Sequence, residues 1–182
     1  MTRLALDPRT EATVTIAWVI IANKPFYPFY VWWLVGDGVG ISAITLASIP
    51  FFLAIPLMAG KRPFAARLAL PLIGTVDTVC ETMVFGRGSA TLLFLAPCMA
   101  LALVSFYAIE KWWQRAVACF IFACFAISWW EIESPIFAWT SDQLATLLSI
   151  NAFAVASLMT LIAIRYAGVA SSPDLDGKAA SQ

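Results

Sequence analysis

Histidine is absent from this chain of 182 residues. Its absence excludes bis-histidine haem ligation, Ser-His and Cys-His catalysis, histidine-containing zinc sites and proton relays through imidazole. Charged side chains are also scarce, since Asp, Glu, Lys and Arg make up 12% of the residues and the formal net charge is zero. The chain therefore lacks the extended basic surface that phosphates require, and we expect no nucleic-acid binding.

Enzyme and metal motifs are lacking as well. The four cysteines contain no Cys-x-x-Cys pair; they are Cys80, Cys98, Cys119 and Cys124. The sequence has no Gly-x4-Gly-Lys-Ser/Thr motif, and "GDGVG" at 36–40 does not have the spacing of a dinucleotide-binding loop. We therefore expect no enzyme, no cofactor and no metal site.

Apolar residues dominate what is present. They make up 62% of the chain, against roughly half in soluble domains, which predicts a protein embedded in the lipid bilayer. About 20 apolar residues cross a membrane, and the charged or Gly/Pro-rich stretches divide the chain into segments of this length. The sequence thus predicts an all-α, polytopic membrane protein, a bundle of six transmembrane helices within residues 1–168. The crossings are expected at roughly 12–35, 40–60, 68–86, 90–109, 116–134 and 142–167, and residues 169–182 are expected to form a disordered cytoplasmic tail.

Basic residues indicate the orientation. With six crossings both termini lie on one side, together with nine basic residues, and Arg87 is the basic residue of the opposite loops. This asymmetry predicts that both termini lie in the cytoplasm, and we expect the membrane to be the bacterial inner membrane. A rival division makes 10–23 an interfacial helix and 25–60 one broken crossing, but it fits the charge asymmetry less well.

Aromatic residues and prolines refine this division. Most tryptophans fall near predicted helix ends, where they are expected to anchor at the membrane surface; they are Trp32, Trp33, Trp112, Trp113, Trp129, Trp130 and Trp139. Trp32 and Trp33, following "PFYPFY", have an alternative role as the lining of an aromatic ligand pocket. Pro25 and Pro28 are expected to kink the first helix.

A polar stripe marks the third predicted helix. On a helical wheel, Asp77, Glu81 and Thr78 fall with Gly74, Thr75 and Thr82 on one arc of about 160°. A carboxylate near the bilayer centre costs roughly 2.5–3.5 kcal/mol. This arc is therefore expected to face the bundle interior, where a cation pairs with the carboxylates or one of them takes up a proton.

Lys24 is the candidate cation. At 1.5 Å per residue from the cytoplasmic helix ends, Lys24 lies at about 18 Å, Asp77 at about 13–14 Å and Glu81 at about 19–20 Å. These depths predict a buried cluster of the three side chains, with carbonyls freed at the Pro25 break helping to bind the ammonium. Asn23 and Asn151 are further candidates for hydrogen bonding within the bundle.

Two interpretations of the cluster remain open. It either fixes the register of the helices or serves as an ion or proton relay or as polar anchors for a ligand. Near the predicted outer ends, Glu131, Glu133 and Asp142 are expected to be solvated, with an acidic mouth for cations as the alternative.

Residues 84–115, "VFGRGSATLLFLAPCMALALVSFYAIEKWWQR", resemble the region around the third and fourth helices of the six-helix membrane sensor modules that precede bacterial cyclases and histidine kinases. The resemblance implies six helices, cytoplasmic termini and a small, often hydrophobic signal. No catalytic or kinase domain is expected after Arg165, so an output would need a separate membrane protein or a second copy of the chain. A sensory or regulatory subunit is the favoured function; the alternatives are a small transporter or ion-conducting protein, and a structural or assembly factor.

Overall fold

Residues 6–170 are described by a computed structural model, and within them the chain is helical with no strand. The α-helices are α1 (Pro8–Asn23), α2 (Phe26–Tyr30), α3 (Val39–Ser42), α4 (Ile49–Ala59), α5 (Pro63–Phe85), α6 (Leu95–Val104), α7 (Lys111–Glu131) and α8 (Ser141–Ala170). Between them lie one π-helical segment, η1 (Val31–Val35), and four 3-10 segments, η2 (Ala43–Ser48), η3 (Arg87–Ser89), η4 (Thr91–Phe94) and η5 (Ala108–Glu110). The predicted all-α class is confirmed.

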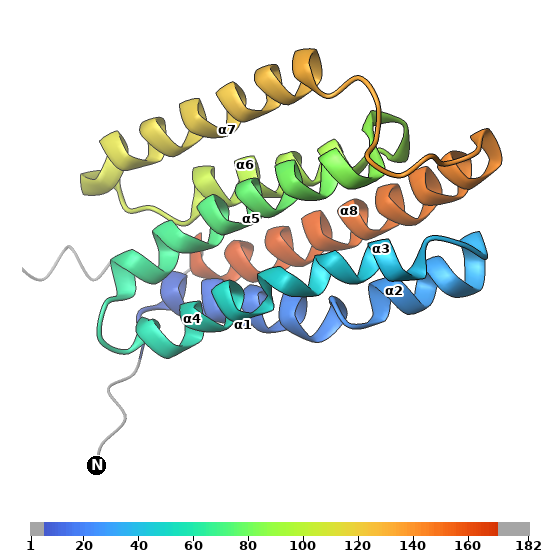
Figure 1. Ribbon diagram of the computed structural model, residues 1–182. Helices are drawn as coiled ribbons and strands as arrows, with labels where there is room; N and C mark the ends of the chain where they lie inside the picture. The colour runs from blue at the N-terminus through green and yellow to red at the C-terminus, as the bar shows by residue number, and fades with distance from the viewer. Residues whose placement is uncertain (1–5, 171–182) are drawn as a thin grey trace, which may run out of the picture.

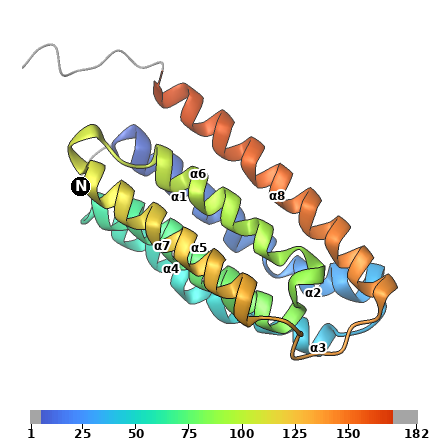
Figure 2. The same cartoon turned by 90° about the horizontal axis from the view of Figure 1, so that it is seen from above.

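The helical segments run back and forth along one common axis, as Figures 1 and 2 show. The start of α1, the end of α4, the starts of α5 and α7 and the end of α8 all lie at the same end of the bundle (Figure 1). We call this the basic end, because its described residues include Arg9, Lys61, Arg62, Lys111, Arg115 and Arg165. Arg3, Lys178 and residues 171–182 of the predicted tail lie outside the described residues, whereas Val169 and Ala170, also predicted to belong to the tail, are part of α8.

Four helices of the described chain are long and apolar enough to cross a membrane: Val39–Ala59, Pro63–Phe85, Ala108–Glu131 and Ser141–Val169. They coincide with four of the predicted crossings. The other two predicted crossings do not contain one continuous helix that is long and apolar enough. The first is interrupted after Asn23, and the fourth is a shorter apolar helix, Thr91–Val104. The chain is therefore an all-α membrane protein by the length and composition of its helices.

Prolines account for two of the interruptions in the helices. The helix starting at Pro8 is interrupted at Lys24 and Pro25, as predicted, and Tyr27 N donates to Lys24 O at 3.1 Å, an i→i−3 bond that tightens the turn. The 3-10 segment η2 ends just before Pro50, which lacks an amide hydrogen and would clash with the carbonyl of Leu46 in a regular α-helix.

Two loop assignments made from the sequence are wrong. Residues 61–67 were expected to form a loop, but α5 begins at Pro63, a favoured first helical residue, and Arg67 lies on this helix. Residues 110–115 were expected to form a turn, but α7 begins at Lys111. Longer helices place the candidate site farther from the basic end: at 1.5 Å per residue, Asp77 lies about 21 Å along α5.

The centre of the bundle is α5, which contacts α1, α4, α6 and α7. Its inward face combines apolar residues with buried threonines: Leu70, Thr75, Thr78 and Thr82. Val76 and Met83 are exposed on the opposite face, 53% and 48% respectively. The predicted division of this helix into a polar inner face and an apolar outer face is confirmed.

Most predicted anchor tryptophans are exposed; they are Trp32, Trp33, Trp112, Trp113, Trp129 and Trp130. Trp139 differs, because it is 9% exposed and belongs to an apolar cluster with Val31, Phe85 and Leu147. Its indole Nε1 donates to Val84 O at 3.4 Å. Trp139 is therefore a packing residue that closes the end of the bundle, and its predicted surface role was wrong.

Candidate functional site

The predicted contact of Lys24 with both acids of α5 is present. Lys24 Nζ lies 2.7 Å from Asp77 Oδ2 and 2.8 Å from Glu81 Oε1. The three side chains are largely buried, with exposed fractions of 11%, 14% and 16% for Lys24, Asp77 and Glu81. Asp77 and Glu81 reach the same ammonium because a spacing of four residues places them on one face of α5.

A backbone carbonyl completes the environment of Lys24. Nζ donates to Thr45 O at 3.0 Å, so the three donors of the ammonium have three oxygen partners. The Phe52 ring centroid lies 5.6 Å from Nζ. The sequence predicted that a carbonyl freed at the Pro25 break would bind the ammonium, but the carbonyl comes from the 3-10 segment η2. At the break, Lys24 O accepts a hydrogen bond from Tyr27 N. The cluster therefore joins α1, η2 and α5.

The cluster contains one more carboxylate than ammonium. Lys24 contacts one oxygen of each acid, and no hydrogen bond reaches Asp77 Oδ1 or Glu81 Oε2 from any residue in 6–170. Removing such charges from water costs several kcal/mol each, so the excess charge requires a proton or a cation.

A lateral groove of about 460 Å³ leads to these two acids. It lies between η2 and the start of α4 on one side and α5 on the other. Its apolar walls include Ile44, Phe51, Leu72, Ile73, Val76 and Cys80. Ile44, Phe51 and Val76 are more than half exposed, so the groove opens on the long side of the bundle. Its volume and its few polar groups in an apolar lining are typical of a small-molecule site.

Two other predicted site residues, Thr78 and Asn151, do not line the groove. Thr78 is buried, and its carbonyl accepts from Thr82 Oγ1 at 2.7 Å. Asn151 is fully buried on α8, where its amide donates to Ser89 O at 2.8 Å and to Thr91 Oγ1 at 3.4 Å, and its Oδ1 accepts from the Tyr27 hydroxyl at 3.2 Å. This network ties α8 to α2 and to the turn after α5. Asn23 is exposed.

A second ionic cluster, at the basic end, was not predicted from the sequence. Arg67 is 5% exposed, and its Nη2 lies 2.5 Å from Glu110 Oε1 and its Nη1 3.2 Å from Asp7 Oδ1. Its Nε has no hydrogen-bond partner among residues 6–170. The Tyr107 hydroxyl also donates to Asp7 Oδ1, at 2.8 Å. The sequence does contain a signal that Arg67 is helical, because Pro63, four residues earlier, is a residue type favoured at the first position of a helix.

Asp7 and Tyr107 have shifted proton affinities. Partial burial disfavours the Asp7 carboxylate, but hydrogen bonds from the Thr10 hydroxyl and amide, the Tyr107 hydroxyl and the charge of Arg67 outweigh it and lower the pKa of Asp7. Burial and the hydrogen bond to Asp7 raise the pKa of Tyr107. These shifts describe a network that is stabilised by the ionised form of Asp7.

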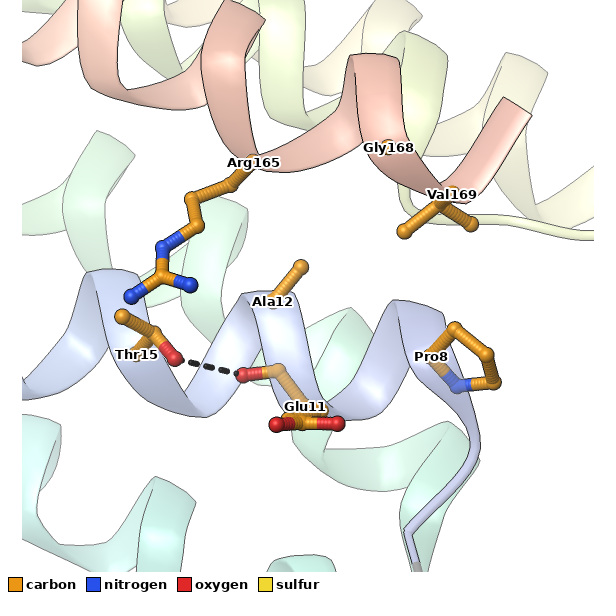
Figure 3. Close-up of a pocket in the computed structure, with 7 residues that line it drawn as sticks. All are labelled: Pro8, Glu11, Ala12, Thr15, Arg165, Gly168 and Val169. Carbon is orange, nitrogen blue, oxygen red and sulfur yellow. Dashed lines mark hydrogen bonds between the residues drawn. The ribbon is translucent and has the colours of Figure 1, made fainter. Parts of the chain in front are cut away.

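A smaller pocket of about 210 Å³ lies between the start of α1 and the end of α8 (Figure 3). Arg165 extends from α8 toward Thr15 of α1, whose hydroxyl donates to the carbonyl of Glu11 at 3.0 Å. Glu11 and Arg165 are exposed at the basic end. Their exposure and the small volume favour a solvated surface depression.

The remaining candidates from the sequence are the acidic residues near the predicted outer helix ends and the cysteines. Glu131, Glu133 and Asp142 are exposed, and Thr140 and Gln143 cap the start of α8 through reciprocal hydrogen bonds of 2.9 and 3.3 Å. All four cysteines are free. Within residues 6–170, no three Cys, Asp or Glu side chains are grouped so as to hold a metal ion.

Comparison of the chain with protein-family models, curated proteins and solved structures gives no match. The site is therefore defined by its own geometry. The fold and the site together define an all-α membrane protein with a charged cluster inside the bundle and an apolar groove that reaches it from the side.

Proposed function

We propose that this chain is a small sensory or regulatory subunit of the bacterial inner membrane that binds a small ligand in the lateral groove. The observation that carries the proposal is the junction of an apolar groove of about 460 Å³ with two largely buried carboxylates. A ligand dissolved in the bilayer reaches such a groove without crossing the bundle. Its apolar part replaces lipid against the walls, and the acids at the inner side orient its polar part.

The proposed membrane topology has six crossings. Residues 8–35 form the first, broken at Pro25, and Thr91–Val104 forms the core of the fourth. At 1.5 Å per residue the latter spans about 21 Å, less than the hydrocarbon core. Its neighbours support the assignment: α6 contacts α5, α7 and α8, so protein can cover the backbone where the helix ends. The basic end is assigned to the cytoplasm by its excess of lysine and arginine.

A regulatory role requires an output. The resemblance of 84–115 to the membrane sensor modules supports a signalling role, and another membrane protein or a second copy of this chain would receive the signal. The lipid bilayer supplies the ligand, and no nucleic acid takes part.

Transport is the second candidate, favoured by the excess charge of the Lys24 cluster. It predicts that Asp77→Asn or Glu81→Gln abolishes uptake or proton-linked flux in vesicles. An assembly factor would show unchanged flux and the loss of a co-purifying partner in the same variants. A sensor would show a ligand-dependent shift in melting temperature and no flux.

Native mass spectrometry of the protein purified in mild detergent tests the proposal. Ala47 lines the groove, so Ala47→Phe adds a bulky ring there without changing a charge; Ala123 is exposed on α7, and Ala123→Phe adds the same side chain away from the groove. We expect one small molecule to accompany the parent protein and Ala123→Phe and to be absent from Ala47→Phe. The proposal fails if the parent carries no small molecule, or if Ala47→Phe retains it.

A further inference from the structure

We infer that the ligand of the lateral groove is a lipid-soluble amine that binds as a monocation, with its ammonium on Asp77 and Glu81 and its apolar body along the groove. This inference rests on the proposed function and specifies the chemical class of the ligand. It follows from three features of the site: its charge, the position of its unused oxygens and the character of its walls.

Charge is the first feature. Lys24 balances one of the two carboxylates, so the cluster lacks one positive charge. No other lysine or arginine borders the groove or contacts Asp77 or Glu81 within the described chain. In a region of low dielectric constant, the missing charge makes the site selective for a cation over a neutral molecule and strongly selective against an anion.

The unused oxygens are the second feature. Asp77 Oδ1 and Glu81 Oε2 receive no hydrogen bond, and neither is among the fully buried unpaired atoms of residues 6–170. Both acids line the groove. An ammonium group donates up to three hydrogen bonds, so it can use both oxygens and supply the positive charge that the cluster lacks. A permanently alkylated ammonium lacks these donors.

The walls are the third feature. Apart from the two acids, the groove is lined by apolar side chains with one serine, Ser48, and one cysteine, Cys80. The cation must therefore carry an apolar body, and a hydrated metal ion or a polyamine would leave its polar groups against Ile44, Phe51 and Leu72.

A membrane contains ammonium groups in its own lipids, and depth distinguishes these from a free amine. Glu81 lies four residues, about 6 Å, before the end of α5, and Asp77 about 12 Å before it. To bring its ammonium to Asp77, a phosphatidylethanolamine headgroup would have to draw its phosphate below the end of α5, toward the apolar side chains of Ile44 and Val76. A free amine brings no anion, so we assign the groove to a free amine.

Three probes of one skeleton test the charge preference: 4-phenylbutylamine, 4-phenylbutanol and 4-phenylbutyrate. Their binding to the full-length protein in nanodiscs of phosphatidylcholine is measured by isothermal titration at pH 7. A charge-assisted hydrogen bond to a carboxylate predicts that the amine binds at least about tenfold more tightly than the alcohol, with no binding of the carboxylate. The same measurement on Ala47→Phe should show loss of amine binding, and Ala123→Phe should bind as the parent does.

Asp77→Asn and Glu81→Gln complete the test, because each leaves Lys24 with one acid and removes the excess charge. In either variant the preference for the amine over the alcohol should fall below about threefold. If a variant does not fold, the comparison of probes on the parent protein decides the outcome. Repeating the titration in nanodiscs rich in phosphatidylethanolamine should leave amine binding unchanged; competition by that lipid would overturn the assignment to a free amine.

The outcomes separate the two proposals. If the amine and the alcohol bind equally well and Ala47→Phe blocks both, the charge preference is wrong, but the groove still binds a ligand. Absence of amine binding overturns the inference, whereas the proposed function is decided by the molecule that co-purifies with the protein.

Discussion

The ring of Trp139 packs directly on the backbone of Gly38. A Cβ atom on Gly38 would lie 2.2 Å from the Cη2 of Trp139, and Gly38 has a positive φ of +76°. The ring centroid of Trp139 also lies 5.7 Å from that of Phe85 and 4.6 Å from that of Phe137. Gly38 therefore meets two requirements at once, a left-handed backbone and room for an indole ring.

Gly38→Ala should destabilise the protein by about 2 kcal/mol or more, because it combines overpacking with strain at positive φ. Gly40→Ala is the matched control, since nothing lies within 4 Å of a Cβ atom there and its φ is not in the left-handed region. Thermal unfolding in mild detergent measures both. Equal melting temperatures for the two variants would contradict the packing described for Trp139.

Lys24→Met should lower stability by about 3–5 kcal/mol, because it leaves two carboxylates buried without their cation. Adding Asp77→Asn and Glu81→Gln to Lys24→Met should restore part of this loss, since no charge then remains in the cluster. Lys61→Met changes an exposed lysine and should have little effect. A Lys24→Met protein as stable as the parent in detergent would disprove the role of the ion pairs.

Asp7→Asn should alter the response to acid. The pKa of Asp7 is lowered in the folded state, so its stabilising contribution is present above the unfolded pKa of about 3.9 and is lost as the pH falls through the folded value. The variant should be less stable than the parent at pH 7, and the difference should shrink toward pH 3. Glu133→Gln removes an exposed acid and should keep the parent's acid response. Melting curves between pH 3 and pH 7 check this, and a constant difference would contradict it.

Asn151→Leu should cost about 2–3 kcal/mol, because it leaves Ser89 O and Thr91 Oγ1 without their donor at a fully buried position. Tyr27→Phe removes only the 3.2 Å hydrogen bond to Asn151 Oδ1 and should cost about 1 kcal/mol or less. Denaturation of the two variants side by side gives the comparison. A larger loss of stability for Tyr27→Phe than for Asn151→Leu would contradict this ranking of the contacts.

Reporter fusions should place the two ends of the bundle on opposite sides of the membrane. Fusions after Lys61 and after Tyr107, both at the basic end, should show cytoplasmic activity, and fusions after Gly88 and Pro135 should show the external pattern. The reverse pattern, or one side for all four, would refute the proposed topology.

The sequence predicts the inward face of α5 and its contact with Lys24 because both depend on one strong effect, the cost of placing charge in lipid. Helical periodicity then orients Asp77 and Glu81, and chain length matches their depth to that of Lys24. The role of Arg67 was missed because a run of basic residues was interpreted as a loop, although Pro63 is a helix-start signal.

Two other features depend on packing between distant segments. The Thr45 carbonyl that accepts from Lys24 belongs to the 3-10 segment η2, and the groove lies between η2 and α5. Neither has a periodic pattern in the sequence. The burial of Trp139 likewise depends on Gly38, a residue 101 positions earlier in the chain.

The two ionic clusters place acid and base in opposite arrangements on the same pair of helices. Near the basic end α1 is preceded by the acid Asp7, which meets Arg67 of α5, whereas after Asn23 the base Lys24 meets Asp77 and Glu81 of α5. If the first helix were inserted in the reverse direction, Asp7 would face two carboxylates and Lys24 would face a guanidinium. The alternation of acid and base therefore favours the observed direction of α1 along α5 over the reverse one.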